Sequence, residues 1–223
     1  MNTIDIFNEF KEKYRKGDFR ISKSGSKTIE IQNAHFTCDK DYIIREPNYD
    51  YAKREVEWYI NQSLNVNDIP GGTPKIWTGC ADPDGFINSN YGWCIFSKEN
   101  GNQFENCLKT LKNDPTSRQG VMLYTRPNMW TDWNKNGRHD FICTYSTQCF
   151  LNEKRDCWHL KYIVYMRSND AVFGFNNDLY WHKWVRDKLA LELTDTYKTV
   201  ICDDVEWNSG SLHVYERHFK FLE

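Results

Sequence analysis

The chain has 223 residues, of which 39% are hydrophobic and 27% are charged, a composition typical of a folded globular protein. This composition excludes a wholly disordered chain, and the length is sufficient to bury a substantial core. The 29 basic and 31 acidic residues leave a net charge of −2, which argues against a general binder of nucleic acid or acidic membranes. No apolar run is long enough to predict a membrane-spanning helix.

The first residues, from Met1 to Lys13, carry acidic side chains early and lack the apolar segment of a signal peptide. The eight cysteines are scattered without a Cys-x-x-Cys pair, at a density below that of a disulfide scaffold. We therefore expect a cytoplasmic protein with reduced thiols, most of them small buried hydrophobic side chains.

Taken in chain order, hydrophobic spacing predicts a mixture of helices and strands. Residues 3–16 are predicted to be a helix, because Phe7, Phe10 and Tyr14 recur at three- and four-residue spacings before Gly17. Residues 19–31 alternate around a Ser-Gly-Ser turn and predict two strands. Further helices are predicted over 50–64, 102–112 and 178–193, and further strands over 121–124, 141–150, 161–167 and 212–215. No repeat or linker divides the chain, so a single α+β domain over residues 1–223 is expected.

Glu55 is a candidate functional residue on the predicted helix over 50–64. A helical projection places it in an aromatic stripe with Tyr51 and Trp58, whereas Glu57 points to the opposite side. A carboxyl group among aromatic rings tends to have a raised pKa, as a general acid or base requires. A partly buried glutamate paired with an arginine is the alternative interpretation.

Cys143 lies in the predicted strand over 141–150, where two-residue alternation places it on one face with Tyr145, Thr147 and Cys149. Most cysteines in such a strand are packed core thiols. A nucleophilic cysteine needs a nearby cation to stabilise its thiolate, and Arg167, at the end of another predicted strand, is the candidate.

Other polar residues lie where strands and helices end. Arg167 and Ser168 end a strand and offer donors that suit a phosphate, although a charged strand end is the simpler interpretation. Asp178 fits the N-cap of the following helix, or the position next to Asn177 acting as the cap. His213 and Tyr215 share one strand face, a spacing that suits either a sugar hydroxyl or packing at a sheet edge.

Two metal-binding patterns are incomplete. The segment from Asp132 to Gly137 begins like a calcium-binding loop, but its twelfth position is Cys143 where a glutamate is required. Cys157 and His159 have no second ligand pair at the spacing of a zinc site. The sequence therefore predicts no metal site, and it has neither a P-loop nor a glycine-rich dinucleotide motif.

Several segments together resemble the thymidylate synthase family, and within it the phage enzymes that hydroxymethylate deoxycytidylate (dCMP). They extend from about residue 18 to residue 218, and their joint order and spacing are more specific than any single motif. The segments are Lys23-Ser-Gly-Ser26, Glu55-Val-Glu-Trp58, Pro74-Lys-Ile-Trp77, Asn88-Ser-Asn-Tyr-Gly-Trp93, Pro115-Thr-Ser-Arg118, Cys143 with Gln148-Cys-Phe150, Arg167-Ser-Asn-Asp170, Gly174-Phe-Asn-Asn-Asp178 and Ser211-Leu-His-Val-Tyr215. The resemblance implies the α+β fold of that family, a central mixed sheet packed by helices, with one sheet face at a homodimer interface.

The resemblance also implies catalytic and phosphate-binding roles. Cys143 matches the nucleophile that adds to carbon 6 of the pyrimidine ring, and Glu55 matches the glutamate that organises water and proton transfer. Lys23, Arg167 and Ser168 match positions that bind the phosphate of the nucleotide.

Further positions match binding residues of the family. Arg118 matches an arginine that reaches the phosphate of the partner subunit, and Gln119 stands where a second arginine is usual. His213 and Tyr215 match the pair that holds the sugar 3′-hydroxyl. Positions beside the folate are matched by Trp77 and Asp170.

Asp178 departs from the synthases, which have asparagine at this position. A carboxylate accepts a hydrogen bond from the amine of cytosine and favours a proton on ring nitrogen 3, which makes carbon 6 more electrophilic. Thr144 also departs, because synthases have histidine directly after the cysteine and hydroxymethylases do not. These features predict the transfer of a one-carbon unit from 5,10-methylenetetrahydrofolate to carbon 5 of dCMP, followed by hydration, giving 5-hydroxymethyl-dCMP and tetrahydrofolate.

Three alternatives remain open at this point. The substrate can be dUMP or CMP, acted on by a hydroxymethylase or a methylase, and a catalytically inactive nucleotide-binding relative is a second alternative. From a different class, nine tryptophans and 16% aromatic residues also suit a carbohydrate-binding module.

For the preferred interpretation we expect a homodimer that binds nucleotide and folate without nucleic acid, membrane or metal. In phages that modify their DNA it would work in the host cytoplasm, where other enzymes of nucleotide synthesis are potential partners.

Overall fold

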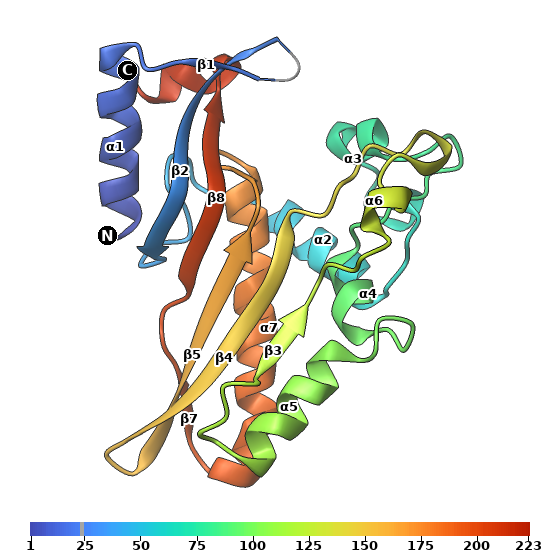
Figure 1. The fold of residues 1–223 in the computed structure, drawn as a ribbon, viewed down its shortest axis with the longest axis vertical. Helices are drawn as coiled ribbons and strands as arrows, with labels where there is room; N and C mark the ends of the chain where they lie inside the picture. The colour runs from blue at the N-terminus through green and yellow to red at the C-terminus, as the bar shows by residue number, and fades with distance from the viewer. Residues whose placement is uncertain (23–24) are drawn as a thin grey trace.

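The structure is a computed structural model that describes residues 1–22 and 25–223. Within these residues a mixed sheet forms the centre of the molecule (Figure 1), and β6 and β7 pair with β8 and β5 outside the main order β1-β2-β8-β5-β4-β3. The strands are β1 (Arg20–Ile21), β2 (Lys27–Thr37), β3 (Val121–Leu123), β4 (Thr144–Lys154), β5 (Cys157–Met166), β6 (Asn169–Asp170), β7 (Val200–Cys202) and β8 (Glu206–Tyr215). The β5–β8 pair is parallel, whereas β2–β8 and β4–β5 are antiparallel, which confirms the predicted mixed sheet.

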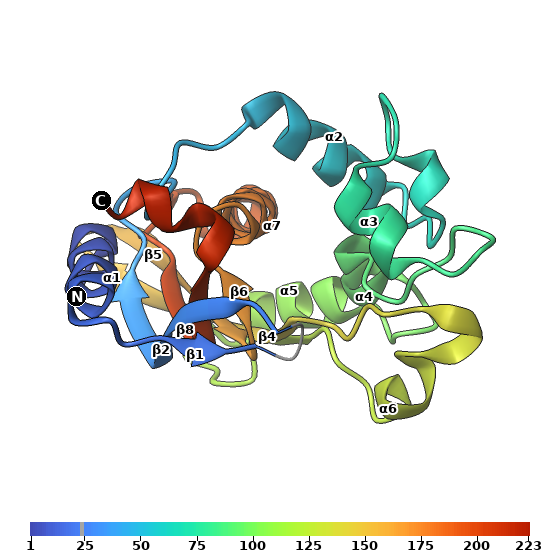
Figure 2. The ribbon, with the colours of Figure 1, turned by 90° about the horizontal axis from the view of Figure 1, so that it is seen from above.

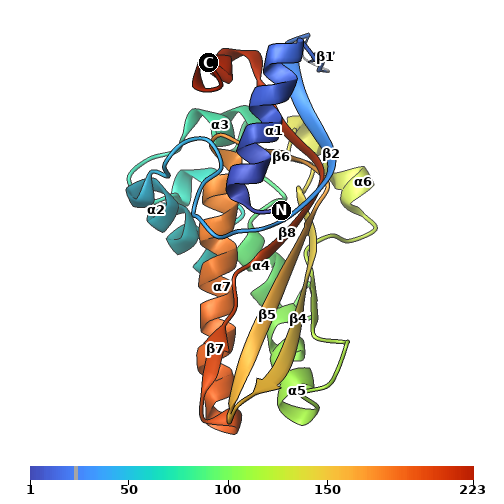
Figure 3. The same cartoon turned by 90° about the vertical axis from the view of Figure 1, so that its left-hand side faces the viewer.

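Helices surround this sheet on one face and at its edges. Figure 3 shows α7 running along one face, and Figure 2 shows α2, α3, α4 and α6 grouped away from the N-terminal helix α1. The helices are α1 (Thr3–Lys16), α2 (Tyr49–Ile60), α3 (Lys75–Cys80), α4 (Tyr91–Phe96), α5 (Gln103–Asn113), α6 (Met129–Asp132) and α7 (Gly174–Tyr197). Short 3₁₀ helices cover Val66–Asp68, Lys135–Gly137 and Glu216–Phe221.

The prediction for α1 is confirmed, and its ends show why the sequence stops there. Asn2 caps the helix, since its side chain accepts from the amides of Ile4 and Asp5, and Asp5 completes a capping box. Gly17 ends the helix with a left-handed backbone at φ 68°. Between these caps Phe10 is buried as part of the core beneath β2.

The long helix α7 begins earlier than predicted. It starts at Gly174, so Asp178 lies inside the helix and the prediction that Asp178 is a helix N-cap is wrong. The physical reason is Asp170, whose carboxylate accepts from the amides of Val172, Phe173 and Gly174 just before the helix. Because Asp170 already accepts from these amides, the side chain of Asp178 does not cap the helix and can bind other groups.

The predicted alternation around Cys143 is also partly wrong. Cys143 precedes β4, and a register shift between Thr144 and Ser146 interrupts the ladder with β5. Such a bulge adds one residue and changes which side chains share a face. Thr144 is therefore fully buried and Tyr145 is exposed, so Tyr145 does not share a face with the buried Thr147 and Cys149 as predicted.

The two faces of the sheet differ in exposure. Val164 and Trp207 point into the core beneath α7 and are fully buried. Their neighbours of opposite parity, Ile163, Tyr165 and Asn208, are partly exposed on the other face. That face contains aliphatic, aromatic and amide groups together.

Candidate active site

Cys143 and Arg167 lie side by side where β4 begins and β5 ends. The Arg167 amide donates to the Cys143 carbonyl at 2.8 Å, and its guanidinium Nη2 lies 3.5 Å from the sulfur. The same guanidinium donates to the carbonyl oxygens of Ile142 at 3.0 Å and Phe141 at 2.6 Å. Backbone acceptors therefore hold the cation beside the thiol, as the sequence analysis predicted for a nucleophilic cysteine.

Burial and charge act in opposite directions on this thiol. Burial raises the pKa of Cys143 to about 11, and the positive charge of Arg167 opposes that rise. The carboxylate of Asp178 raises the pKa further, which places Asp178 within electrostatic range of the sulfur. Cys143 keeps partial solvent exposure, so a ligand can approach it.

Glu55 is buried with 5% of its surface exposed, as its place in the aromatic stripe predicted. Its Oε1 accepts from the Tyr51 hydroxyl at 2.5 Å and from the Trp77 indole at 2.8 Å. Burial raises the pKa of Glu55, and these two hydrogen bonds partly offset the effect. Its hydrogen-bond partners are thus a phenol and an indole, and the alternative of pairing with an arginine is wrong.

Asp178 lies within electrostatic range of Glu55 and Cys143. Its Oδ2 accepts from the Asn169 side-chain amide at 2.7 Å. Burial, followed by the negative charge of Glu55, raises the pKa of Asp178 well above its ordinary value. The two carboxyl groups therefore lie near enough that ionisation of one disfavours ionisation of the other.

His213 and Tyr215 share one face of β8, as predicted, with ring centroids 4.9 Å apart. Asp170 on β6 pairs with His213 across the sheet. Burial lowers the pKa of His213, while the Asp170 carboxylate opposes this shift. Cys143 also has an electrostatic effect on Tyr215, so the strand end lies within range of the thiol.

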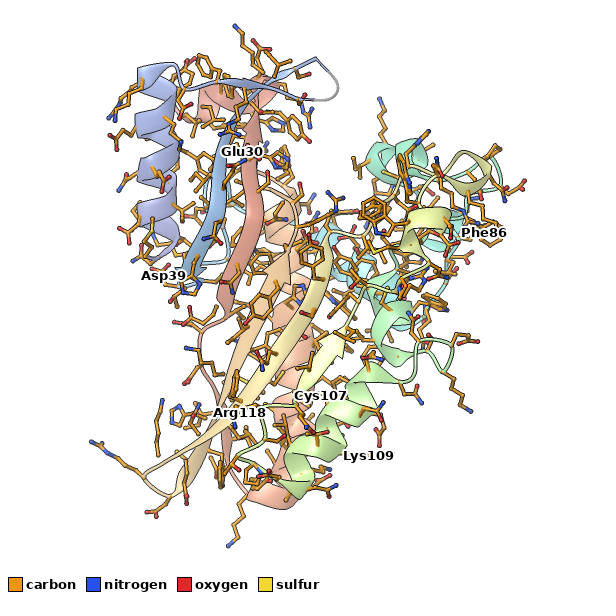
Figure 4. All side chains as sticks on the ribbon, in the orientation of Figure 1. Glu30, Asp39, Phe86, Cys107, Lys109 and Arg118 are labelled. Carbon is orange, nitrogen blue, oxygen red and sulfur yellow. The ribbon has the colours of Figure 1, made fainter. Side chains whose placement is uncertain are left out.

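The remaining predicted site residues have fewer contacts with the residues around Cys143. Arg118 is exposed beside the lower part of β4 in Figure 4, where its carbonyl accepts from the Gln148 side chain at 3.0 Å. Gln119 is exposed next to it, and Ser168 is partly exposed directly after Arg167. Lys23 lies outside the described residues.

Sequence reasoning missed several residues that complete the site. Tyr51 and Asn169 bind the two carboxyl groups, and Tyr91 on α4 lies within electrostatic range of both Asp178 and Cys143. Tyr51 is one helical turn before Glu55, a spacing that signals contact in a helix. Asn169 follows directly after the phosphate motif, but no local signal shows that it reaches across to α7.

No group of three or more histidine, cysteine, aspartate or glutamate side chains that could hold a metal ion occurs within residues 1–22 and 25–223. Over the same ranges, no helix is long and apolar enough to cross a membrane. All eight cysteines are free thiols.

The fold and the site define a class of protein: an α+β protein with a cation-assisted cysteine next to two buried carboxyl groups. Residues 7–223 match the family model described as "Thymidylate synthase". The chain belongs to the thymidylate synthase family, which confirms the resemblance.

Relatives of known name refine this assignment. The chain is 47% identical over 211 residues to the deoxycytidylate 5-hydroxymethyltransferase of Enterobacteria phage T4, covering 94% of this chain and 84% of the phage protein. The enzyme of the same name from Enterobacteria phage T2 matches equally well. Thymidylate synthase from Bacillus atrophaeus is 27% identical over 179 residues, covering 77% and 73% of the two chains.

A solved structure supports the fold class. The thermostable thymidylate synthase A from Bacillus subtilis superposes with a TM-score of 0.70 at 21% identity, covering all of this chain and 83% of that one. This likeness confirms the predicted α+β fold. Membership of the family excludes the carbohydrate-binding module as the class of this protein.

Proposed function

We propose that this protein transfers a one-carbon unit from 5,10-methylenetetrahydrofolate to carbon 5 of dCMP and then adds water, giving 5-hydroxymethyl-dCMP and tetrahydrofolate. The single observation that carries the choice of substrate is Asp178, a buried carboxyl held by Asn169 within range of Cys143. The names of the phage relatives, 47% identical to this chain, support the same substrate.

Asp178 recognises the amino edge of cytosine. One carboxyl oxygen accepts from Asn169, and a carboxyl group has further acceptor capacity for the exocyclic amine. The raised pKa favours a proton at this place, which Asp178 shares with ring nitrogen 3 of the base. Uracil presents a proton on nitrogen 3 and a carbonyl at position 4, so it does not match this arrangement.

Cys143 adds to carbon 6 of the ring as a thiolate, which makes carbon 5 nucleophilic. Arg167 lowers the free energy of the thiolate and, with Ser168, binds the 5′-phosphate, so one cation serves both sulfur and phosphate. At the end of the reaction the sulfur is expelled and the aromatic ring is restored. His213 and Tyr215 bind the sugar 3′-hydroxyl, and Lys23 adds to the phosphate contacts.

Glu55 positions the water that becomes the hydroxyl group of the product. Burial raises its pKa, which favours the protonated form, and Tyr51 and Trp77 fix its orientation. Hydration in place of reduction distinguishes the product from that of a thymidylate synthase.

The residues present fit a folate. The half-buried Trp77 offers a flat ring next to Glu55, and Asp170 lies near His213 on the neighbouring strand. When bound, methylenetetrahydrofolate supplies the methylene carbon that attaches to carbon 5. Trp77 and Asp170 then position it beside the nucleotide.

The proposed active form is a cytoplasmic homodimer in which each chain is one catalytic domain. Arg118 supports this proposal because it is exposed and its carbonyl bonds Gln148 within β4, whereas the Arg167 guanidinium bonds the segment just before β4. A second copy packed on the partly exposed sheet face would receive Arg118 at its own phosphate site. The two active sites would then share residues.

Tritium release from [5-³H]dCMP, with and without methylenetetrahydrofolate, tests the proposal, and mass spectrometry identifies the product. We expect folate-dependent release and 5-hydroxymethyl-dCMP, with no turnover by Cys143→Ser although that variant still binds dCMP. Competition between dCMP, dUMP and CMP in one sample measures base and sugar preference. Formation of 5-methyl-dCMP with dihydrofolate, or preferred turnover of dUMP, would contradict the proposal.

A further inference from the structure

Asp140 is a buried acidic residue that the proposed reaction does not use. It lies three residues before Cys143, with 6% of its surface exposed. Residues 138–142 form neither helix nor strand, so no regular ladder of backbone hydrogen bonds fixes the segment that leads to the nucleophile. The position of this segment therefore depends on the individual contacts that its residues make.

Four donor groups from two successive residues surround the Asp140 carboxylate. Oδ2 accepts from the backbone amides of Asn88 and Ser89, the latter at 2.8 Å, and from the Ser89 hydroxyl at 3.0 Å. Oδ1 accepts from the Asn88 side-chain amide at 3.0 Å. Asn88 and Ser89 are themselves buried. A carboxylate, which only accepts, matches four donors completely, and bonds of this kind are strong where water is excluded.

Asn90, the next residue, is bonded to the helix that carries Glu55. Its Nδ2 donates to the Trp58 carbonyl on α2 at 3.2 Å and to a second carbonyl just after that helix at 2.8 Å. Asn90 has no exposed surface, so these bonds too are shielded from water. Residues 88–90 therefore connect the helix of Glu55 with the segment that leads to Cys143.

The other end of this segment is bonded by Arg167. Its guanidinium donates to the carbonyl oxygens of Phe141 at 2.6 Å and Ile142 at 3.0 Å. The residues that lead to Cys143 are thus held by an anion on one side and by a cation on the other. The sulfur therefore has a fixed place relative to both α2 and the end of β5.

We infer that Asp140 is a positioning residue for the proposed reaction: through residues 88–90 its carboxylate fixes the place of Cys143 relative to Glu55. This inference rests on the proposed function, in which the sulfur holds the ring while water positioned by Glu55 adds to the attached methylene. The two groups act on one intermediate from different elements, so a small error in their spacing lowers the yield of hydration. The role also accounts for the three polar residues that begin the Asn88–Trp93 motif.

The ratio of two products tests the positioning role. Tritium released from [5-³H]dCMP counts the rings that have reacted at carbon 5, and 5-hydroxymethyl-dCMP counts the rings that were then hydrated. With 2-mercaptoethanol present, a methylene that is not hydrated is captured as a thioether. Asp140→Asn keeps the shape of the side chain but replaces one acceptor oxygen by a donor. We expect it to lower kcat about tenfold and the ratio of hydroxymethyl product to tritium at least about threefold.

This ratio separates positioning from a general loss of folded protein, which would lower both products equally. Two further changes identify the connection. Asn90→Ser keeps an oxygen that can cap α4 but loses the donors to α2, so we expect the ratio to fall as in Asp140→Asn. In the double variant the ratio should fall no further than in the lower single variant, because both changes interrupt one connection.

Asp39→Asn is the matched control. The Asp39 carboxylate accepts from the amide of Thr3 at 3.0 Å and from its hydroxyl at 2.6 Å. Ser89 offers the same pair of donors to Asp140, but Asp39 bonds the start of α1 and not the segments around the site. We therefore expect Asp39→Asn to keep the wild-type kcat and the wild-type ratio.

Hydrogen exchange of the Asn88 and Ser89 amides gives a readout that needs no substrate. We expect both amides to exchange at least about tenfold faster in Asp140→Asn than in the wild type or in Asp39→Asn. Unchanged exchange, a wild-type ratio in folded Asp140→Asn, additive losses in the double variant, or the same losses in Asp39→Asn would each overturn the inference. If the wild-type protein does not act on dCMP, the proposed function fails, whereas the exchange result still decides whether Asp140 holds residues 88 and 89.

Discussion

At the scale of single residues, Cys143 is governed by two opposing effects. Burial disfavours the thiolate, and the Arg167 guanidinium 3.5 Å from the sulfur favours it. Because the pKa of Cys143 is raised to about 11, the neutral thiol predominates in the free protein at pH 8. Binding of the nucleotide and its positioning over the sulfur must then supply the rest of the activation.

Alkylation with iodoacetamide should measure this balance. We expect the rate at Cys143 to rise about tenfold per pH unit between about pH 7 and about pH 10, because only the thiolate reacts. Arg167→Gln removes the stabilising charge, so its rate at pH 8 should be lower still. Peptide-resolved mass spectrometry separates the cysteines, with Cys157 on the distant β4–β5 hairpin as the internal control. An unchanged rate in Arg167→Gln would show that Arg167 does not act on the sulfur.

Asn169 should affect base selectivity through Asp178. Its side-chain amide is the donor that fixes one carboxyl oxygen, at 2.7 Å. In Asn169→Ala we expect the ratio of kcat/KM for dCMP over dUMP to fall about tenfold or more, because the carboxyl group loses its fixed orientation. Asn106→Ala on the exposed surface of α5 should leave the ratio unchanged. If Asn169→Ala retains wild-type selectivity, Asp178 is oriented by other groups.

The sequence predicted single residues best where one element supplies the whole signal. The burial of Glu55 follows from helical periodicity alone, whereas the pairing of Cys143 with Arg167 was only one candidate contact between two strand ends. Asn169 and Trp77 instead reach their partners across different elements. Such contacts depend on tertiary packing, which a local pattern does not contain.

At the scale of elements, length was one factor in what the sequence could predict. The helices α1 and α5 and most of β5 have enough repeats for a periodic signal and were predicted nearly as they occur, whereas only 212–215 of the ten-residue strand β8 was predicted. The six-residue helices α3 and α4 have fewer than two turns and were missed. The start of α7 was placed too late because Asp170, outside the periodic segment, caps the amides before it.

The contact between α2 and α4 should be sensitive to one glycine. A Cβ at Gly92 would lie 1.7 Å from the Tyr59 carbonyl oxygen, so any larger residue must push the helices apart. We expect Gly92→Ala to lower the free energy of unfolding by at least about 2 kcal/mol and to reduce kcat, since Tyr91 is the adjacent residue.

Gly79→Ala on α3 is the matched control for this substitution. A Cβ at Gly79 would meet no atom within 4 Å, so we expect stability equal to the wild type or higher by up to about 1 kcal/mol. Urea denaturation of both variants gives the comparison. Equal stability of Gly92→Ala and the wild type would show that α4 moves without cost.

At the scale of the whole molecule, the sheet separates a buried face from a partly exposed one. Family membership and the mixed sheet could be predicted from the joint order of motifs. The arrangement of two subunits cannot be read from one chain, because the partly exposed side chains of β5 and β8 are compatible with contact to solvent as well as to a partner. Arg118 bonds Gln148 within β4 and Arg167 bonds the segment before β4, and this separation is the feature that favours a shared site.

Mixing two inactive variants should test this shared site. Cys143→Ser and Arg118→Ala are each expected to have low activity at low dCMP, because one lacks the nucleophile and the other lacks a phosphate contact. In a mixed dimer one site combines an intact cysteine with the partner's intact arginine. We expect activity to recover to at most half of the wild-type value after subunit exchange. No recovery in mixtures shown by native mass spectrometry to contain mixed dimers would contradict a shared site.

The way Arg167 is held has a consequence for which isomers of the nucleotide can react. Two carbonyl oxygens on the segment that carries the sulfur bind its guanidinium, so the spacing between cation and nucleophile is set by the backbone. Only a nucleotide whose phosphate and ring carbon are separated by that same spacing can engage both groups together. We therefore expect deoxycytidine 3′-monophosphate, which has the same charge and base, to be neither a substrate nor an effective competitor.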